Sequence, residues 1–290
     1  MSPCKSISII IPTFNEEHSI ISTINETINT LKDNNIVGEI IVVDDGSTDN
    51  TNLYSRSIPN ITVLTHPHNI GYGKALKTGI TAAKFPIIAI IDADGTYPPS
   101  LLPKLLDKLN DGFNMVVGAR KGSNYKGSAI KWQMRYLLRF LVEWTTGKRI
   151  PDINSGMRIF YKNEIIRFFP RLCNTFSFTT SATLCYMMND LFVSYVSINY
   201  EKRIGKSHVK IWKDSLRTLQ FILQAIAYYN PLKLFLLLSI LVLIFALVSL
   251  IIGLIFKITI AYFMSALAIS VSIIVFALGI IAELLRHSDS

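Results

Sequence analysis

The chain has 290 residues, half of them hydrophobic, and a formal charge of +9 at pH 7. A mean hydropathy of +0.38 is high for a soluble protein and indicates that part of the chain meets lipid. The basic balance does not indicate nucleic acid, because the sequence shows no recognised nucleic-acid motif and no basic stripe away from the segment before its apolar C-terminal part. Anionic lipid or phosphate is the better partner.

Short runs rich in β-branched residues alternate with helical patterns along the first half of the chain. Five of these runs are predicted to form buried parallel strands: Ser8–Ile11, Ile40–Val43, Ile61–Leu64, Ile87–Ile91 and Met115–Val117. Strands that alternate with helices in this way predict an α/β fold with a mostly parallel sheet. Isoleucines at helical spacing follow Asn15, which is predicted as the N-cap of the first helix.

Three further helical segments are predicted. Leucines repeat at helical spacing after Pro98, and proline is tolerated in the first turn of a helix. The segment Ala129–Thr146 interleaves aromatic and basic side chains, so it is either an amphipathic helix at a membrane interface or a helix packed on the domain. Leu216–Tyr229 is a second amphipathic segment, with tyrosines at its end as in an aromatic belt.

Two apolar runs without charged side chains follow, Leu234–Phe256 and Ile258–Ala282, and each is long enough to cross the ~30 Å hydrocarbon layer. Basic residues are concentrated before the first run and Arg286 follows the second, so both termini and the α/β part of the chain are predicted to be cytoplasmic. Met1–Ser8 lacks the apolar stretch of a signal peptide, in keeping with that orientation. The predicted organisation is a cytoplasmic domain over 1–200, a basic loop with a juxtamembrane amphipathic helix over 201–232, and two transmembrane helices over 233–285.

Two carboxylates directly follow the fourth predicted strand, as Asp92-Ala93-Asp94. Ligands of open α/β sheets bind beyond the carboxyl ends of the strands, and two carboxylates two residues apart can converge on one ion. Oxygen ligands of this kind suit Mg²⁺ or Mn²⁺, which would bridge the diphosphate of a nucleotide. A solvated turn is the alternative interpretation of this triplet.

Polar residues also follow the first two predicted strands. Asp44 and Asp45 end the second strand, and their carboxylates could accept hydrogen bonds from a base N–H and from ribose hydroxyls. Pro12–Glu16 ends the first strand. Three polar clusters at three strand ends therefore predict one cleft.

These residues resemble glycosyltransferase family two and, within it, the dolichyl-phosphate mannose synthase and polyprenyl-phosphate glycosyltransferase group. The resemblance covers roughly residues 6–215 and implies the nucleotide-sugar-binding GT-A fold, an α/β fold with a mostly parallel sheet, here followed by a two-helix transmembrane hairpin. It implies that five residues hold the nucleoside: Pro12, Phe14, Glu16, Val42 and Asp44. It also implies that Asp92 and Asp94 bind the metal and the diphosphate.

The resemblance further implies two groups of basic residues around the phosphates. Arg120 and Arg135 would contact phosphate groups, and a basic loop would close over the diphosphate, with Lys202, Arg203, Lys206 and His208. Ile150–Gly156, which contains Asp152, resembles the acceptor-side motif of the family, and Phe176–Thr180 resembles its sugar-side segment. Two positions depart from the mannose synthase pattern: Thr96 replaces a glutamine and His208 replaces a lysine.

The predicted reaction is the inverting transfer of a hexose from a UDP- or GDP-sugar to a polyprenyl phosphate, dolichyl or undecaprenyl, at the cytoplasmic membrane face. An acceptor phosphate is already ionised at neutral pH and needs positioning rather than deprotonation. Arg120, Arg135 and the 202–208 loop are the candidates for that task, because the fork of an arginine matches phosphate geometry. The sequence leaves open the sugar, the nucleotide base and the oligomeric state.

Three alternatives stand beside this reaction. A membrane-anchored transferase could act on a saccharide hydroxyl, with Asp152 as its base. A processive polysaccharide synthase is disfavoured because two spans make a poor export channel. A non-catalytic nucleotide-binding membrane adaptor is disfavoured by the intact Asp92 and Asp94.

Overall fold

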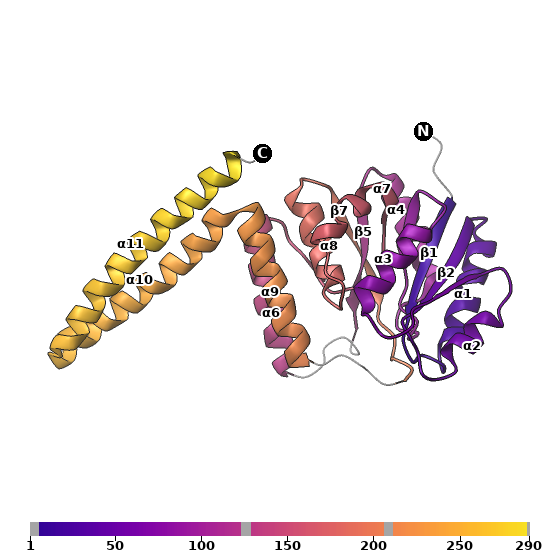
Figure 1. The fold of residues 1–290 in the computed structure, drawn as a ribbon, viewed down its shortest axis with the longest axis horizontal. Helices are drawn as coiled ribbons and strands as arrows, with labels where there is room; N and C mark the ends of the chain where they lie inside the picture. The colour runs from indigo at the N-terminus through magenta and orange to yellow at the C-terminus, as the bar shows by residue number, and fades with distance from the viewer. Residues whose placement is uncertain (1–5, 123–128, 206–210, 289–290) are drawn as a thin grey trace. The chain divides into compact units, whose positions relative to one another are not determined.

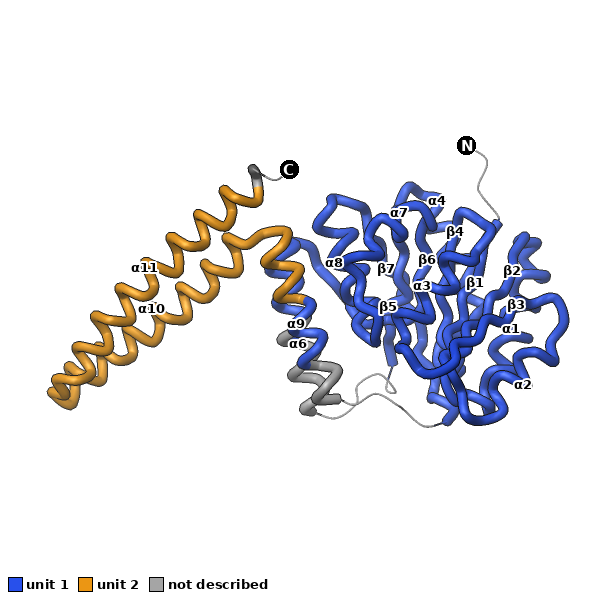
Figure 2. The backbone as a smooth tube through the Cα atoms, in the orientation of Figure 1, with its two compact units in different colours: residues 1–221 blue, residues 222–290 orange. Residues whose placement is uncertain are grey.

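The computed structural model describes residues 6–122, 129–205 and 211–288, with the side chains of 129–135, 137–138, 211–215 and 287–288 outside the description. It divides the chain into two compact units, residues 1–221 and 222–290 (Figure 2). The two predicted transmembrane segments belong to the second unit. The residues with predicted chemistry belong to the first.

A seven-stranded sheet forms the centre of the first unit (Figure 1). Its spatial order is β3-β2-β1-β4-β6-β5-β7, and only β6 runs antiparallel to its neighbours. The strands are β1 Ser6–Thr13, β2 Val37–Asp44, β3 Thr62–Thr65, β4 Ile87–Ile90, β5 Met115–Lys121, β6 Arg158–Tyr161 and β7 Val193–Asn199. The five predicted strands are confirmed, whereas β6 and β7 are additions that the sequence analysis missed.

The register of the sheet brings three strand ends to one edge. Thr13 of β1 pairs with Asp44 of β2, and Ile10 of β1 pairs with Ile90 of β4. The backbone N–H of Ile91 still donates to the carbonyl of Ile10, at 3.1 Å, so the chain leaves the sheet immediately before Asp92. The residues that follow β1, β2 and β4 therefore emerge side by side.

Helices cover both faces of the sheet, because successive side chains of a strand point to opposite faces. Ile7, Ile9 and Ile11 pack with the first layer, whereas Ile10 packs with the second. The first layer holds α1 Ile20–Asp33 and α4 Leu102–Asn110, with α2 Thr51–Arg56 beside them. The second layer holds α3 Tyr72–Ala82, α7 Lys162–Arg167 and α8 Phe178–Met188. Short 3₁₀ turns, Pro99–Leu101 and Phe169–Arg171, precede α4 and follow α7.

The predicted N-cap of the first helix is wrong. The helix begins at Ile20, after Ser19, and Asn15 lies in the preceding loop with a φ of 54°. Asn15 instead joins two loops, since its N–H donates to Ser47 Oγ at 3.0 Å and its Oδ1 accepts from the N–H of Thr48 at 2.8 Å. The helix predicted after Pro98 is confirmed.

The amphipathic helix α6, Ala129–Thr146, combines both predicted environments. In its last turns Leu141, Val142 and Thr145 are buried, and the helix contacts α8. Tyr136 and Phe140 are exposed. Among the described side chains, α6 therefore packs on the domain and still presents aromatic side chains outward. The second amphipathic helix is α9, Ile211–Tyr229.

The second unit contains a helical hairpin of α10, Pro231–Phe256, and α11, Thr259–Ser288. Lys257, with a φ of 54°, makes the turn. Small buried residues line the seam at intervals of seven on α10, and Ser239 and Ser272 exchange hydrogen bonds across it, with their hydroxyl oxygens 2.9 Å apart. Most other side chains are apolar and exposed. Within the described residues these two helices are long and apolar enough to cross a membrane.

Candidate active site

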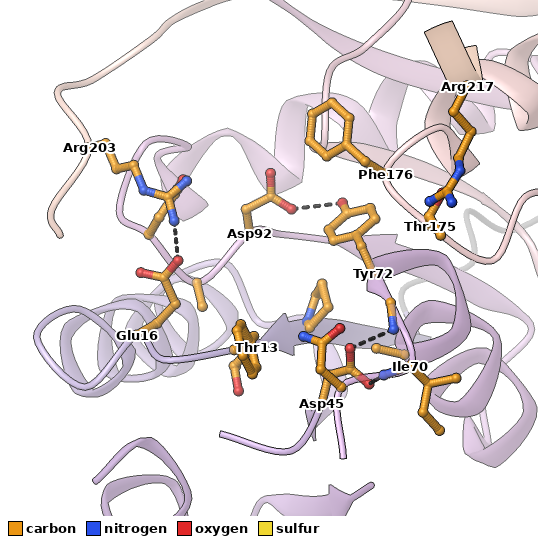
Figure 3. A pocket seen from close by; sticks show the side chains of 17 residues that line it. Thr13, Glu16, Asp45, Ile70, Tyr72, Asp92, Thr175, Phe176, Arg203 and Arg217 are labelled. Atoms are coloured by element: carbon orange, nitrogen blue, oxygen red, sulfur yellow. Dashed lines mark hydrogen bonds and ion pairs between the residues drawn. The ribbon is translucent and has the colours of Figure 1, made fainter. Parts of the chain in front are cut away.

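A cavity of about 520 Å³ lies where β1, β2 and β4 end (Figure 3). This volume is in the range of pockets that bind small molecules. Its lining includes Pro12, Thr13, Phe14, Glu16, Asp45, Asn69, Ile70, Gly71, Tyr72, Ala75, Asp92, Ala93, Asp94, Thr175, Phe176, Arg203 and Arg217. The three polar clusters predicted at strand ends therefore contribute to one cavity.

Asp45 shapes one wall of this cavity. Its Oδ1 accepts a hydrogen bond from the N–H of Ile70 at 3.0 Å, and its Oδ2 accepts from the N–H of Gly71 at 2.8 Å (Figure 3). His66 Nδ1 lies 2.7 Å from the same carboxylate. Gly71 has a φ of 120°, which an L side chain rarely adopts. Asp45 thus holds the loop before α3 in the shape that closes the cavity.

Two of the predicted nucleoside-binding residues lie behind the cavity rather than in its lining. Val42 is fully buried in the core. The carboxylate of Asp44 accepts hydrogen bonds from the N–H of Ser47, at 3.0 Å, and from Asn52 Nδ2, at 2.7 Å. Asp44 therefore stabilises the loop after β2, whereas its neighbour Asp45 reaches the lining.

Asp92 and Asp94 both line the cavity and have different partners. The hydroxyl of Tyr72 donates to Asp92 Oδ1 at 2.8 Å (Figure 3). Asp94 Oδ1 accepts from the N–H and the hydroxyl of Thr96, at 3.1 and 2.5 Å. Asp94 Oδ2 lies 3.0 Å from Arg203 Nη1, and the same guanidinium pairs with Glu16. One arginine is therefore shared by two carboxylates, with a third close by.

This carboxylate cluster carries surplus negative charge. Burial raises the pKa of Glu16 to about 7 against the opposing effect of Arg203, and Asp94 and Asp92 raise it further. Burial also raises the pKa of Asp92 to about 6, again with help from Asp94. A divalent cation bound between these carboxylates would offset their mutual repulsion. Within the described part of the chain no three His, Cys, Asp or Glu side chains form a metal cluster, but Mg²⁺ commonly binds through one or two carboxylates plus substrate phosphates. Asp92 and Asp94 fit that pattern.

The predicted acceptor-side motif passes directly beside Asp92. A Cβ atom on Gly156 would overlap the Asp92 carboxylate, so this position admits no side chain without a shift. The N–H of Gly156 donates to the hydroxyl of Tyr97 at 2.8 Å. Within the same motif, Asn154 Oδ1 accepts a hydrogen bond from Thr180 Oγ1 at 2.5 Å, which connects the motif to the predicted sugar-side segment. Both predicted motifs are therefore close to the carboxylates.

Arg120 and Asp152 pair with each other instead of lining the cavity. Arg120 Nε and Nη2 donate to the two oxygens of Asp152, at 2.6 and 2.8 Å, and the N–H of Arg120 adds a third bond at 3.2 Å. Asp152 is buried, and the guanidinium lies 5.4 Å from the ring centre of Tyr200. Arginine thus occupies the oxygens that Asp152 would need as a general base.

The remaining predicted basic residues divide into three groups. Arg203 lines the cavity, as described above. Lys202 is exposed and, among the described residues, does not contribute to the lining. The side chain of Arg135 and the whole of Lys206 and His208 lie outside the described residues.

Sequence reasoning did not single out several residues of the cavity, among them Thr13, Tyr72 and Arg217. Thr13 is buried, and its hydroxyl has no hydrogen-bond partner within the described residues. Tyr72 stands between two glycines, a signal of close backbone approach, because a Cβ on Gly73 would overlap the carbonyl of Cys173. Arg217 has no local signal, since it belongs to an amphipathic helical segment and not to a loop that follows a strand.

Open α/β sheets form a class of domain that binds its ligands beyond the carboxyl ends of the strands, where this chain has its polar clusters. Solved structures share this fold. A glucosyl-3-phosphoglycerate synthase from Mycobacterium tuberculosis, solved with Mn²⁺, uridine diphosphate and phosphoglyceric acid, matches with a TM-score of 0.62. The match covers 76% of this chain and 78% of that chain at 20% identity. The predicted GT-A-like fold with a mostly parallel sheet, followed by two apolar helices, is confirmed.

The family model described as Glycosyl transferase family 2 matches residues 8–179, more than half of the chain. The chain belongs to this family, as the resemblance predicted. An undecaprenyl-phosphate 4-deoxy-4-formamido-L-arabinose transferase from Yersinia pestis is 28% identical over 194 residues, which cover 62% of this chain and 58% of the relative. A dolichyl-phosphate beta-glucosyltransferase from Trichomonas vaginalis is 33% identical over 175 residues, 54% of each chain. The chain thus spans less than two thirds of the length of these curated relatives.

Proposed function

We propose that this chain transfers a hexose from a UDP- or GDP-sugar to a polyprenyl phosphate at the cytoplasmic face of a membrane, with inversion at the anomeric carbon. One observation carries the proposal: a cavity at three strand ends joins a cluster of carboxylates to arginines, in a chain that also contains two helices of membrane-spanning length. The curated relatives are named as transferases to undecaprenyl phosphate and dolichyl phosphate, which supports the acceptor class.

The chemistry requires one displacement. An oxygen of the acceptor phosphate attacks the anomeric carbon, the bond from that carbon to the diphosphate oxygen breaks, and the nucleoside diphosphate leaves with the electron pair. Because the acceptor is already an anion, no side chain has to remove a proton. The occupied carboxylate of Asp152 is therefore compatible with this reaction.

The residues that line the cavity have separate roles in the proposed reaction. Pro12 and Phe14 form the wall offered to the nucleoside. Asp92 and Asp94 would hold Mg²⁺ or Mn²⁺, which when bound neutralises negative charge on the leaving diphosphate. Tyr72 fixes the rotamer of Asp92 through its hydrogen bond. Arg203 stands next to both the carboxylates and the space that the diphosphate would occupy, and its buried Nε has no partner within the described residues.

The membrane part of the proposal rests on α10 and α11. Their apolar side chains are largely exposed, which is costly in water and favourable in hydrocarbon. Both termini and the first unit would be cytoplasmic, according to the positive charge before α10. The bilayer would then carry the acceptor and keep it close to the enzyme.

The test is a transfer assay with the purified full-length protein in detergent. A panel of UDP- and GDP-sugars is offered with polyprenyl phosphate and with Mg²⁺, Mn²⁺ or EDTA. We expect an acid-labile glycolipid that depends on the metal. Asp94→Asn should lower the rate at least about 100-fold, because charge stabilisation by a metal contributes several kcal/mol. Asp107→Asn, an exposed carboxylate on α4, is the matched control and should stay within about twofold. Nucleotide binding without lipid product, or transfer to an oligosaccharide instead, would contradict the proposed acceptor.

A further inference from the structure

The cavity contains a second arginine with an environment unlike that of Arg203. Arg217 belongs to the part of α9 that lies in the first unit and contributes to the cavity lining. Within the described residues it has no hydrogen-bond or ion-pair partner, whereas Arg203 is held by Glu16 and Asp94. A half-buried guanidinium without such a partner has N–H donors available for hydrogen bonds to a ligand.

The position of Arg217 is fixed by the next residue along the helix. Thr218 is buried, and its hydroxyl lies 2.7 Å from the hydroxyl of Ser177, the residue that precedes α8. Successive side chains on a helix point about 100° apart, so the turn that directs Thr218 to α8 directs Arg217 elsewhere. Figure 3 shows Arg217 beside Thr175 and Phe176, on the opposite side of the cavity from Glu16 and Arg203. The Thr218–Ser177 contact thus anchors the helix at the point where Arg217 reaches the cavity.

The charges in the cavity indicate what Arg217 binds. Glu16, Asp92 and Asp94 gather near Arg203, Asp45 is bonded to the loop before α3, and Arg217 lies on the other side of the cavity from Glu16. A ligand that spans the cavity would therefore meet the Glu16, Asp92 and Asp94 cluster on one side and, within the described residues, an unpaired cation on the other. The planar fork of an arginine matches two oxygens of a phosphate. We infer that Arg217 is a phosphate-binding residue of the active site, supplied by the helix that leads toward the apolar hairpin.

This inference rests on the proposed function for the identity of the phosphate. Two sources share the chemistry: the diphosphate of the donor and the phosphate of the polyprenyl acceptor. A role for α9 in binding would mean that the segment which connects the two units also contributes to the active site. None of the sequence motifs assigned that role to residues 211–229.

The experiment measures binding by the full-length protein in detergent, by calorimetry, with Mg²⁺ present. The probes are UDP and GDP for the donor diphosphate, and farnesyl phosphate as a short polyprenyl phosphate. Arg217→Gln should weaken binding of one class of probe roughly tenfold or more, as expected for the loss of a charge-assisted hydrogen bond. Arg167→Gln, an exposed arginine on α7, is the matched control and should leave both affinities unchanged.

Each outcome decides the inference. Weaker binding of UDP or GDP alone identifies the donor, weaker binding of farnesyl phosphate alone identifies the acceptor, and weaker binding of both places Arg217 between the two phosphates. Unchanged affinity for all probes overturns the inference, as does a wild-type protein that binds none of them. If Arg217→Gln lowers the melting temperature, Arg217→Met replaces it, because methionine keeps an unbranched apolar stem without the charge. Failure of the proposed function appears separately, as phosphate binding that depends on Arg217 without sugar transfer.

Discussion

The first unit contains two arginine–carboxylate groups that differ in structure, although the resemblance implied a phosphate-binding role for both arginines. Arg120 and Asp152 form a one-to-one pair with two side-chain hydrogen bonds, and the side chains of both are largely buried, at 12% and 2% exposure. Arg203 is shared between Glu16 and Asp94 and is 28% exposed. The first pair satisfies its charges internally. The second leaves more negative charge than one arginine can neutralise.

The difference indicates where a ligand is expected. A bidentate, buried pair has few bonds left to offer and mainly connects β5 to the 150–156 segment. In the second group, carboxylates of raised pKa could bind a cation, and the arginine that they share could donate to a phosphate. The second group lines the cavity and the first does not. The predictions below test whether this division between a structural and a ligand-binding group is correct.

The largest effect is expected from breaking the closed pair. Asp152→Ala leaves the guanidinium of Arg120 without its carboxylate, and the loss of one partner of a buried pair costs about 3–5 kcal/mol of stability. We expect a much lower melting temperature of the full-length protein in detergent, with the loss of activity following the loss of fold. The double variant Arg120→Met with Asp152→Leu should recover most of the stability. A folded Asp152→Ala protein with an unchanged melting temperature and no activity would instead support a catalytic role for Asp152.

Features that depend on local patterns could be predicted from the sequence. The apolar runs before Asp92 and after Asn230 have the length and composition of a buried strand and a membrane-spanning helix, and neither depends on distant residues. Parallel strands place their carboxyl ends at one edge, so the cluster of Glu16, Asp92 and Asp94 followed from the order of elements.

Features that depend on long-range pairing could not be predicted. Asp44 and Asp45 are neighbours, but only the loop geometry decides that Asp45 reaches the cavity while Asp44 accepts from Ser47. A single arginine such as Arg158 is expected on the surface, yet it begins β6 and is fully buried. Its guanidinium donates to the carbonyls of Ser155 and Thr179, at 2.6 and 2.9 Å. A strand that starts with a charged residue does not show the apolar pattern by which the other strands were recognised.

A smaller effect is expected from the hydrogen bond that orients Asp92. Tyr72→Phe removes the hydroxyl that donates to Asp92 Oδ1 and keeps the ring. Loss of a hydrogen bond to a charged group should lower kcat/KM about tenfold and raise the metal concentration needed for half-maximal rate, with little change in melting temperature. Tyr54→Phe, on α2 and outside the cavity lining, is the matched control. An unchanged metal dependence in Tyr72→Phe would show that Asp92 is positioned by other contacts.

The smallest effect is expected in the pH dependence of stability. In the unfolded chain the Glu16 carboxyl has a pKa near 4.5, and in the folded chain burial raises the pKa to about 7. Between these values the folded state holds a proton that the unfolded state has released, so stability falls as the pH rises from about 4.5 to about 7. In EDTA, Glu16→Gln should reduce that fall by a few degrees of melting temperature, and Glu26→Gln, an exposed carboxylate on α1, should not.

The slope of melting temperature against pH tests whether Arg203 compensates the charge of its carboxylates less completely than Arg120 does. If Arg203 neutralised Glu16 as completely as Arg120 neutralises Asp152, the folded carboxylate would be favoured and Glu16→Gln would not reduce the fall of stability with pH. A reduced fall in Glu16→Gln would mean that Arg203 does not fully compensate the burial of Glu16 beside Asp92 and Asp94. The negative charge that Arg203 leaves uncompensated would attract a divalent cation, which in turn would bind a diphosphate. An equal slope in the wild type and in Glu16→Gln would therefore remove the main electrostatic distinction between the cavity and the closed pair.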